Sequence, residues 1–117
     1  MLSDADDCSG SPSGAPLPTQ MAIDMARQLR VLADPVRLRI MSILLSHEHG
    51  SARVHELTEA FDVTEPTISH HLKALRDAGL VDCEVEDARS FHSVTPIGAQ
   101  LFRHVMRLFD VPPPGTP

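Results

Sequence analysis

The chain is short and acidic, with 117 residues and a formal net charge of −6 at pH 7. A chain of this length predicts one small domain, and its two cysteines, Cys8 and Cys83, do not make a disulfide scaffold. It has no apolar run long enough to span a bilayer and no hydrophobic region of a signal peptide, so we expect a cytoplasmic protein without a membrane partner.

The two ends of the sequence differ in composition from the segment between them. Residues 1–18 are rich in Ser, Pro, Gly and Asp and bury too little apolar surface to offset the entropy of ordering, which predicts a disordered tail. Residues 111–117 form a second, Pro-rich tail. The folded domain is therefore predicted over residues 19–110.

Within this domain, the spacing of apolar residues predicts four helices, two strands and a last helix. Thr95 and Pro96 begin that last helix, and the prolines after Val111 stop it. His47–Ser51 is predicted to be a loop. The other expected elements are helices at Thr19–Leu32, Pro35–His47, Arg53–Phe61 and Thr64–Ala78, and strands at Val81–Val85 and Ser90–Val94.

The fourth helix is the most informative part of the sequence. Thr64 can cap it with a hydroxyl, and Gly79 supplies the residue at which it ends. Its apolar residues recur at i, i+4 and i+7 and form one stripe: Ile68, Leu72 and Leu75. With that stripe turned inward, hydrogen-bond donors and cations point to solvent or lie beside that face: Thr67, Ser69, His70, Lys73 and Arg76. An ordinary amphipathic helix would show the same stripe. The stripe alone therefore cannot distinguish such a helix from one whose polar face binds a ligand, and the neighbouring segments are needed to do so.

Three segments, in this order and spacing, resemble the ArsR/SmtB family of small dimeric winged-helix repressors. They are Leu32–Ile40 (LADPVRLRI), the short helix near Val54–Phe61, and Thr67–Val81 (TISHHLKALRDAGLV). The resemblance covers residues 20–109. It implies a mainly α (α+β) fold, a winged helix-turn-helix of order ααααββα, and binding of double-stranded operator DNA. A two-fold dimer would read an imperfect inverted repeat.

The predicted DNA contacts lie on the fourth helix, at the tip of the strand hairpin and on the second helix. Ser69 and His70 are candidates for base edges or close phosphates, whereas Lys73 and Arg76 are candidates for phosphates. The full set is Arg37, Thr67, Ser69, His70, Lys73, Arg76 and Arg89. Acidic residues surround Arg89, and the overall charge opposes a polyanion, so selective binding with little non-specific affinity is expected.

The first and last helices carry apolar stripes that lie outside a small three-helix core. The family resemblance implies that these helices form the two-fold interface. The predicted interface residues are Met25, Leu29, Leu101, Val105 and Leu108.

The signal that the protein senses is harder to predict. Members of the family commonly sense metals, but the thiolate motif Cys-Val-Cys-Asp-Leu of the third helix is here Arg53–Leu57, without either sulfur, and the ligand pattern of the last helix is missing. His47, His49 and His55 cluster around one loop and the third helix, where Glu48 or Cys8 could join them. Nitrogen and oxygen ligands suit nickel or zinc better than arsenic.

Other interpretations remain open at this stage. Cys83 is either a small buried residue or a redox switch, and a regulatory partner protein could sense the signal instead. The acidic wing also fits a winged-helix module that binds a protein. An enzyme is not expected, because the sequence shows no nucleophile with a paired base, phosphate-binding glycine loop or carboxylate pair.

Overall fold

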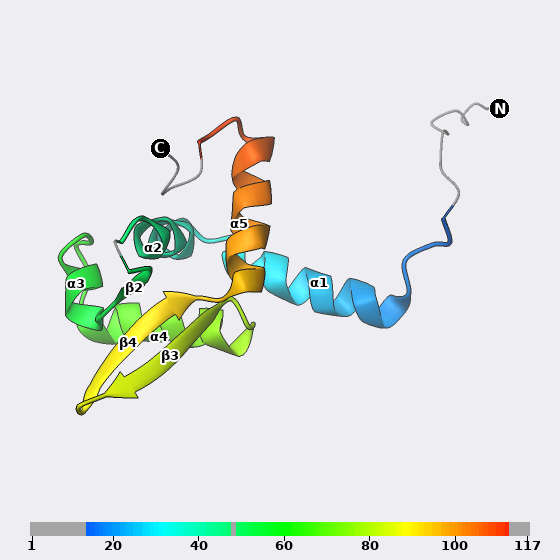
Figure 1. Ribbon diagram of the computed structural model, residues 1–117. Helices are drawn as coiled ribbons and strands as arrows, with labels where there is room; N and C mark the ends of the chain where they lie inside the picture. The colour runs from blue at the N-terminus through cyan, green and yellow to red at the C-terminus, as the bar shows by residue number, and fades with distance from the viewer. Residues whose placement is uncertain (1–13, 48, 113–117) are drawn as a thin grey trace.

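The computed structural model describes residues 14–47 and 49–112, in which helices pack with a small antiparallel sheet whose hairpin projects beyond them (Figure 1). Cys8, Glu48 and most of both predicted tails lie outside these residues. The elements are α1 (Thr19–Leu32), α2 (Pro35–Ser46), β2 (Ser51–Ala52), α3 (Val54–Thr58), α4 (Glu65–Asp77), β3 (Val81–Glu86), β4 (Arg89–Val94) and α5 (Pro96–Leu108).

Most predicted elements agree with the structure, and α1 has the predicted bounds. The loop predicted at His47–Ser51 is wrong at its end, because Ser51 begins the short strand β2, which pairs with β4. Two residues are too few to show the alternation that identifies a strand, so only the tertiary pairing reveals β2. Helix α3 is also shorter than predicted and ends at Thr58, whose hydroxyl donates to the carbonyl of His55 at 2.8 Å.

Three helices begin in the same way, with a side-chain cap followed by a proline in the first turn. Each capping oxygen accepts a hydrogen bond from a backbone N–H three residues later: Asp34 from Arg37, Thr64 from Thr67 and Thr95 from Gly98. The prolines are Pro35, Pro66 and Pro96. Since the first turn has N–H groups without intrahelical partners, proline loses no hydrogen bond there and presets the backbone. These local signals explain why the sequence locates the helix starts well.

The core is aliphatic and lies where α2, α4 and the start of β3 meet. The predicted stripe of α4 is fully buried, as are residues from every neighbouring element. The side chains with the least exposure are Ile40, Met41, Leu44, Leu57, Ile68, Leu72, Leu75, Leu80, Val81 and Phe102. Burial of a side chain of this size contributes about 1.5–3 kcal/mol, so the stripe holds α4 firmly in one orientation.

The hairpin of β3 and β4 forms the wing, and β4 lies between β3 and β2 in the sheet. Asp87 and Ala88 make its turn with φ angles of 52° and 63°. Two consecutive left-handed residues are typical of the hairpin turns whose twist matches the flanking strands. The register places Cys83 opposite His92 and Glu86 opposite Arg89.

Helices α1 and α5 lie at the edge of the core, to which they contribute Leu32 and Phe102, and both keep uncovered apolar side chains. In Figure 1, α1 extends away from the other elements. Of the predicted interface residues, Met25, Leu29 and Leu108 are exposed, whereas Leu101 and Val105 are half-buried and Leu101 packs against the core. No helix in the described residues is both long and apolar enough to cross a membrane.

The junction of α5 with the wing depends on a very close approach of two backbone segments. A Cβ atom at Gly98 would clash with the carbonyl oxygen of Leu80. Thr95 strengthens the same junction, because its hydroxyl donates to the carbonyl of Gly79 at 2.8 Å and its N–H donates to the carbonyl of Leu80 at 3.0 Å. Gly98 is therefore required by packing rather than by backbone conformation.

We expect Gly98→Ala to lower the free energy of unfolding by about 1–3 kcal/mol, because α5 must move away from Leu80. Urea unfolding followed by circular dichroism measures the loss. Gln100→Ala, at an exposed position of the same helix, should stay within about 0.5 kcal/mol of wild type. Equal stability of both variants would show that the junction is not tight.

Candidate nucleic-acid interface

The surface of α4 opposite its buried stripe carries the predicted contact residues. All five of them are exposed: Thr67, Ser69, His70, Lys73 and Arg76. Lys73 donates to Asp77 at 3.0 Å, but both side chains are more than 60% exposed. An exposed pair of this kind contributes little to stability, so the ammonium group of Lys73 can exchange its partner for a phosphate at low cost.

Thr67 is already engaged in the N-terminal cap of α4. Its hydroxyl lies 3.1 Å from that of Thr64, whose oxygen also accepts from the N–H of Thr67. The Thr67 hydroxyl can still offer a lone pair or a proton outward, but it is oriented by the cap. His70 lies near the middle of the exposed face, and Ser69 lies on the flank toward Arg76. Neither side chain takes part in the cap, so both are better placed than Thr67 to reach a base edge.

The structure places Arg37 differently from the prediction of a DNA contact. Its side chain is half-buried, and its Nε donates to Nδ1 of His71 at 3.0 Å. A second guanidinium nitrogen donates to the carbonyl of Val31 at 3.4 Å. Because these bonds join α1, α2 and α4, Arg37 fixes the orientation of α4 from behind.

Two histidines near α4 have a pKa below the ordinary value of the imidazole group. Burial lowers the pKa of His71 from its ordinary value of 6.5; the Arg37 and His70 charges add to this effect, and Asp34 opposes it. Burial also lowers the pKa of His92 from 6.5, with a smaller contribution from the Arg76 cation. His92 is only 6% exposed, and its Nδ1 has no hydrogen-bond partner among the described residues.

These two shifts predict a loss of stability in acid. Because both pKa values lie below 6.5 in the folded state, the unfolded chain binds more protons once the pH falls under that value. Their contribution to stability is complete above about pH 6.5 and is lost as pH falls toward the folded-state values.

Urea unfolding at pH 7.5 and at pH 5.5 measures this effect. We expect His92→Leu to lose less stability than wild type between the two pH values, because it removes one of the buried ionisable groups. The control is His104→Gln, at an exposed position on α5. A His92→Leu variant with the pH dependence of wild type would contradict the assignment.

The candidate metal ligands do not come together in the protomer. Nδ1 of His47 lies 2.9 Å from the carbonyl oxygen of Ile43, His49 lies beside Glu84 on the open face of the sheet, and His55 lines a separate hollow near Arg89. In residues 14–47 and 49–112, no group of three or more His, Cys, Asp or Glu side chains is placed to hold a metal ion. The prediction that His47, His49 and His55 converge on one metal ion is therefore wrong for the described residues. His49 and His55 line different hollows, because β2 and the start of α3 lie between them, and His47 lies against the end of α2.

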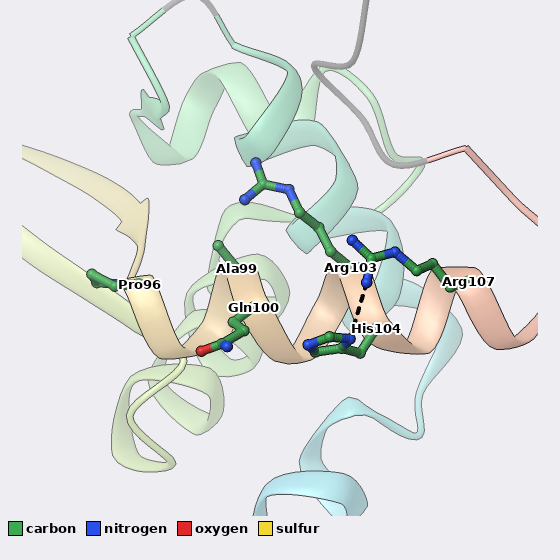
Figure 2. Close-up of a pocket in the computed structure, with 6 residues that line it drawn as sticks. All are labelled: Pro96, Ala99, Gln100, Arg103, His104 and Arg107. Atoms are coloured by element: carbon green, nitrogen blue, oxygen red, sulfur yellow. Dashed lines mark hydrogen bonds between the residues drawn. The ribbon is translucent and has the colours of Figure 1, made fainter.

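Another hollow runs along the outer face of α5, away from α4. Figure 2 shows Arg103, His104 and Arg107 along this face, with a guanidinium nitrogen of Arg107 3.3 Å from Nδ1 of His104. This basic face was not predicted from the sequence, although α5 contains no acidic residue between Pro96 and Leu108. The hollow is open and lies beside the predicted dimer stripe, so we do not assign it to DNA.

The fold is that of a winged helix-turn-helix protein: α4 packs through its buried stripe, α3 precedes it, and the hairpin of β3 and β4 forms the wing. Comparisons with known proteins support this class. The model of the bacterial regulatory protein family arsR matches residues 34–82. The chain is 33% identical over 100 residues to the biofilm growth-associated repressor of Agrobacterium fabrum, with 83% of each chain covered. It is 40% identical over 70 residues to the transcriptional repressor SmtB of Mycobacterium tuberculosis, covering 60% of this chain and 50% of SmtB.

Solved structures show the same fold. The homodimeric winged helix-turn-helix DNA-binding domain Mb0332 of Mycobacterium bovis superposes with a TM-score of 0.69 at 27% identity, over 84% of this chain and 91% of that domain. The chain belongs to the ArsR family of bacterial regulatory proteins. It spans about half the length of SmtB.

Proposed function

We propose that this protein is a transcriptional repressor that binds operator DNA as a homodimer. The observation that carries the proposal is the division of α4 into a fully buried apolar stripe and an exposed face of donors and cations. A helix held rigidly by one face can present the other to the major groove, where side-chain donors read base edges. The repressor names of its relatives support the same conclusion.

Two residues of α4 are proposed to read bases, and three cations to contact phosphates. Ser69 and His70 take the first role, while Lys73, Arg76 and Arg89 take the second. Thr67 supports the reading face through the cap. Arg37 is proposed to position α4 rather than touch DNA, because its guanidinium is already bonded to His71 and Val31.

Changing Ser69 or His70 to Ala should weaken binding to the operator by about 1–3 kcal/mol per half-site, because each change removes a base-edge partner. Both side chains are exposed, so the unfolding curve should hardly change. Fluorescence anisotropy with a labelled promoter fragment upstream of the gene measures the affinity, and Gln100→Ala is the control. Unchanged affinity in both α4 variants would show that this face does not read DNA.

The homodimer is proposed from the uncovered apolar residues of α1 and α5. Met25, Leu29 and Leu108 are 46%, 48% and 83% exposed, respectively, so the described residues of one protomer leave them largely uncovered. An isolated helix of this length with exposed apolar residues is marginal in water, so a second copy that covers α1 would stabilise both. The homodimeric domain of Mycobacterium bovis supports this assembly.

Leu108→Glu should give a folded monomer, because the exposed Leu108 contributes to the interface and not to the core. Leu101→Glu and Val105→Glu are less clean tests, since both positions are half-buried and a charge there would also unfold the domain. Loss of the second half-site should reduce operator affinity roughly 100-fold. Sedimentation at micromolar concentration measures the assembly, with Arg103→Glu, at an exposed position on another face of α5, as the control. A monomeric wild-type chain would contradict the two-fold assembly.

Metal responsiveness stays a prediction for this protein, and so do nickel or zinc as the ion. It is supported by the family resemblance and by the histidine content. Because the described part of one protomer holds no three-ligand group, such a site would need ligands from the partner or from residues outside that part. Titration of the dimer with either ion, with and without operator DNA, tests it. A partner protein that relays the signal likewise remains a prediction.

A further inference from the structure

A hollow of about 420 Å³ lies beside the N-terminal turn of α4, between α3 and the tip of the wing. Its charged and ionisable lining comes from three separate elements. Arg53 and His55 come from the start of α3, Glu65 from the first turn of α4, and Arg89 from the start of β4. Arg89 is distant in sequence from the other three residues, so only the fold brings it beside them. Of the four, only Arg89 was predicted to contact DNA.

The two guanidinium groups in this hollow have no carboxylate partner. Among the described residues, the only ion pair within 4.0 Å joins Lys73 to Asp77 on the exposed face of α4. Glu65 lies in the hollow but pairs with neither arginine, and Glu56 uses its carboxylate to accept from the backbone N–H of Arg53 at 2.7 Å. Two unpaired guanidinium groups facing one hollow repel each other, and an anion between them removes that repulsion.

The position of the hollow relative to α4 suggests which anion binds. Glu65, Ser69 and Arg76 recur at i, i+4 and i+11 and therefore share the flank of α4 that faces the wing. A DNA strand whose base edges are read from the middle of α4 has its backbone along this flank. A phosphate of that backbone would then lie over the hollow, and the planar guanidinium group matches its oxygens in geometry.

We propose that Arg53, His55 and Arg89 bind one backbone phosphate in each half-site, and that Glu65 weakens this contact. The inference rests on the proposed function and adds a site to it. Glu65 is placed where its charge repels the same phosphate that the arginines attract. This arrangement limits non-specific binding, because the bidentate hydrogen bonds of a guanidinium group need the aligned geometry of the seated complex, whereas the negative charge of Glu65 weakens the attraction of any phosphate near the hollow.

Salt dependence separates this phosphate contact from base reading. Arg53→Gln should lower operator affinity about 10-fold and reduce the slope of log K against log salt concentration by about 1 per half-site, since fewer counterions are released. Glu65→Gln should have the opposite effect and raise the affinity for operator and for unrelated duplex DNA alike. His55→Gln should lower both of these affinities, by less than Arg53→Gln does. Anisotropy titrations of each variant over 50 to 300 mM KCl, on both duplexes, measure these effects.

The matched control is Arg103→Gln, which removes the same charge from the outer face of α5. It should leave the slope unchanged, and thermal unfolding should show all four variants folded, since these side chains are exposed or half-exposed. A wild-type slope in Arg53→Gln, or weaker binding in Glu65→Gln, overturns the phosphate site. The proposed function survives that result if Ser69→Ala still loses operator affinity.

Two further outcomes are decisive. If wild type binds no duplex at low salt, both the proposed function and the phosphate site are wrong. If calorimetry with inorganic phosphate shows binding at micromolar concentration that Arg53→Gln abolishes, while the DNA slope stays unchanged, the hollow takes a free anion and the DNA assignment is overturned.

Discussion

The burial of one stripe of α4 is the constraint on which the rest of the molecule depends. Ile68, Leu72 and Leu75 are almost completely shielded from water, so rotation of α4 about its axis would expose apolar surface on one side and bury cations on the other. The reading face is therefore fixed by hydrophobic burial and not by polar contacts of its own. This separation leaves the exposed residues free to vary with the operator while the fold is unchanged.

Polar contacts beside α4 add to the buried stripe in fixing the orientation of the helix. The bond from Arg37 to His71 requires a neutral imidazole, because Nδ1 must accept, and burial lowers the pKa of His71 in the same direction. On the other flank, the buried His92 lies near enough to Arg76 for the cation to lower its pKa further. Both flanks of the reading helix thus depend on uncharged histidines, which links the geometry of the DNA-binding surface to pH through stability.

The sequence predicted those parts of the structure that local signals control. Caps followed by proline located the starts of α2, α4 and α5, and apolar periodicity identified the buried face of α4. It could not predict β2, which exists only through pairing with β4, nor the inward course of Arg37. The prediction of a histidine site was wrong for a related reason: His49 and His55 are close in sequence, but β2 and the start of α3 lie between them and place their side chains at different hollows. Arg53 and Arg89 are the opposite case: they are far apart in sequence, but the wing places Arg89 at the same hollow as Arg53.

The charge of the chain is easier to understand once its distribution in the fold is known. Four acidic residues lie on the wing, whereas α5 has basic residues and no acidic ones: the acidic residues are Asp82, Glu84, Glu86 and Asp87. A protein whose net negative charge repels the DNA phosphates gains affinity only where its cations contact phosphates at short range. Each such contact requires α4 to lie in the groove. Net negative charge and specific DNA binding are therefore compatible here: long-range repulsion lowers the affinity for every sequence, and the short-range contacts restore it for the one sequence that lets the helix enter.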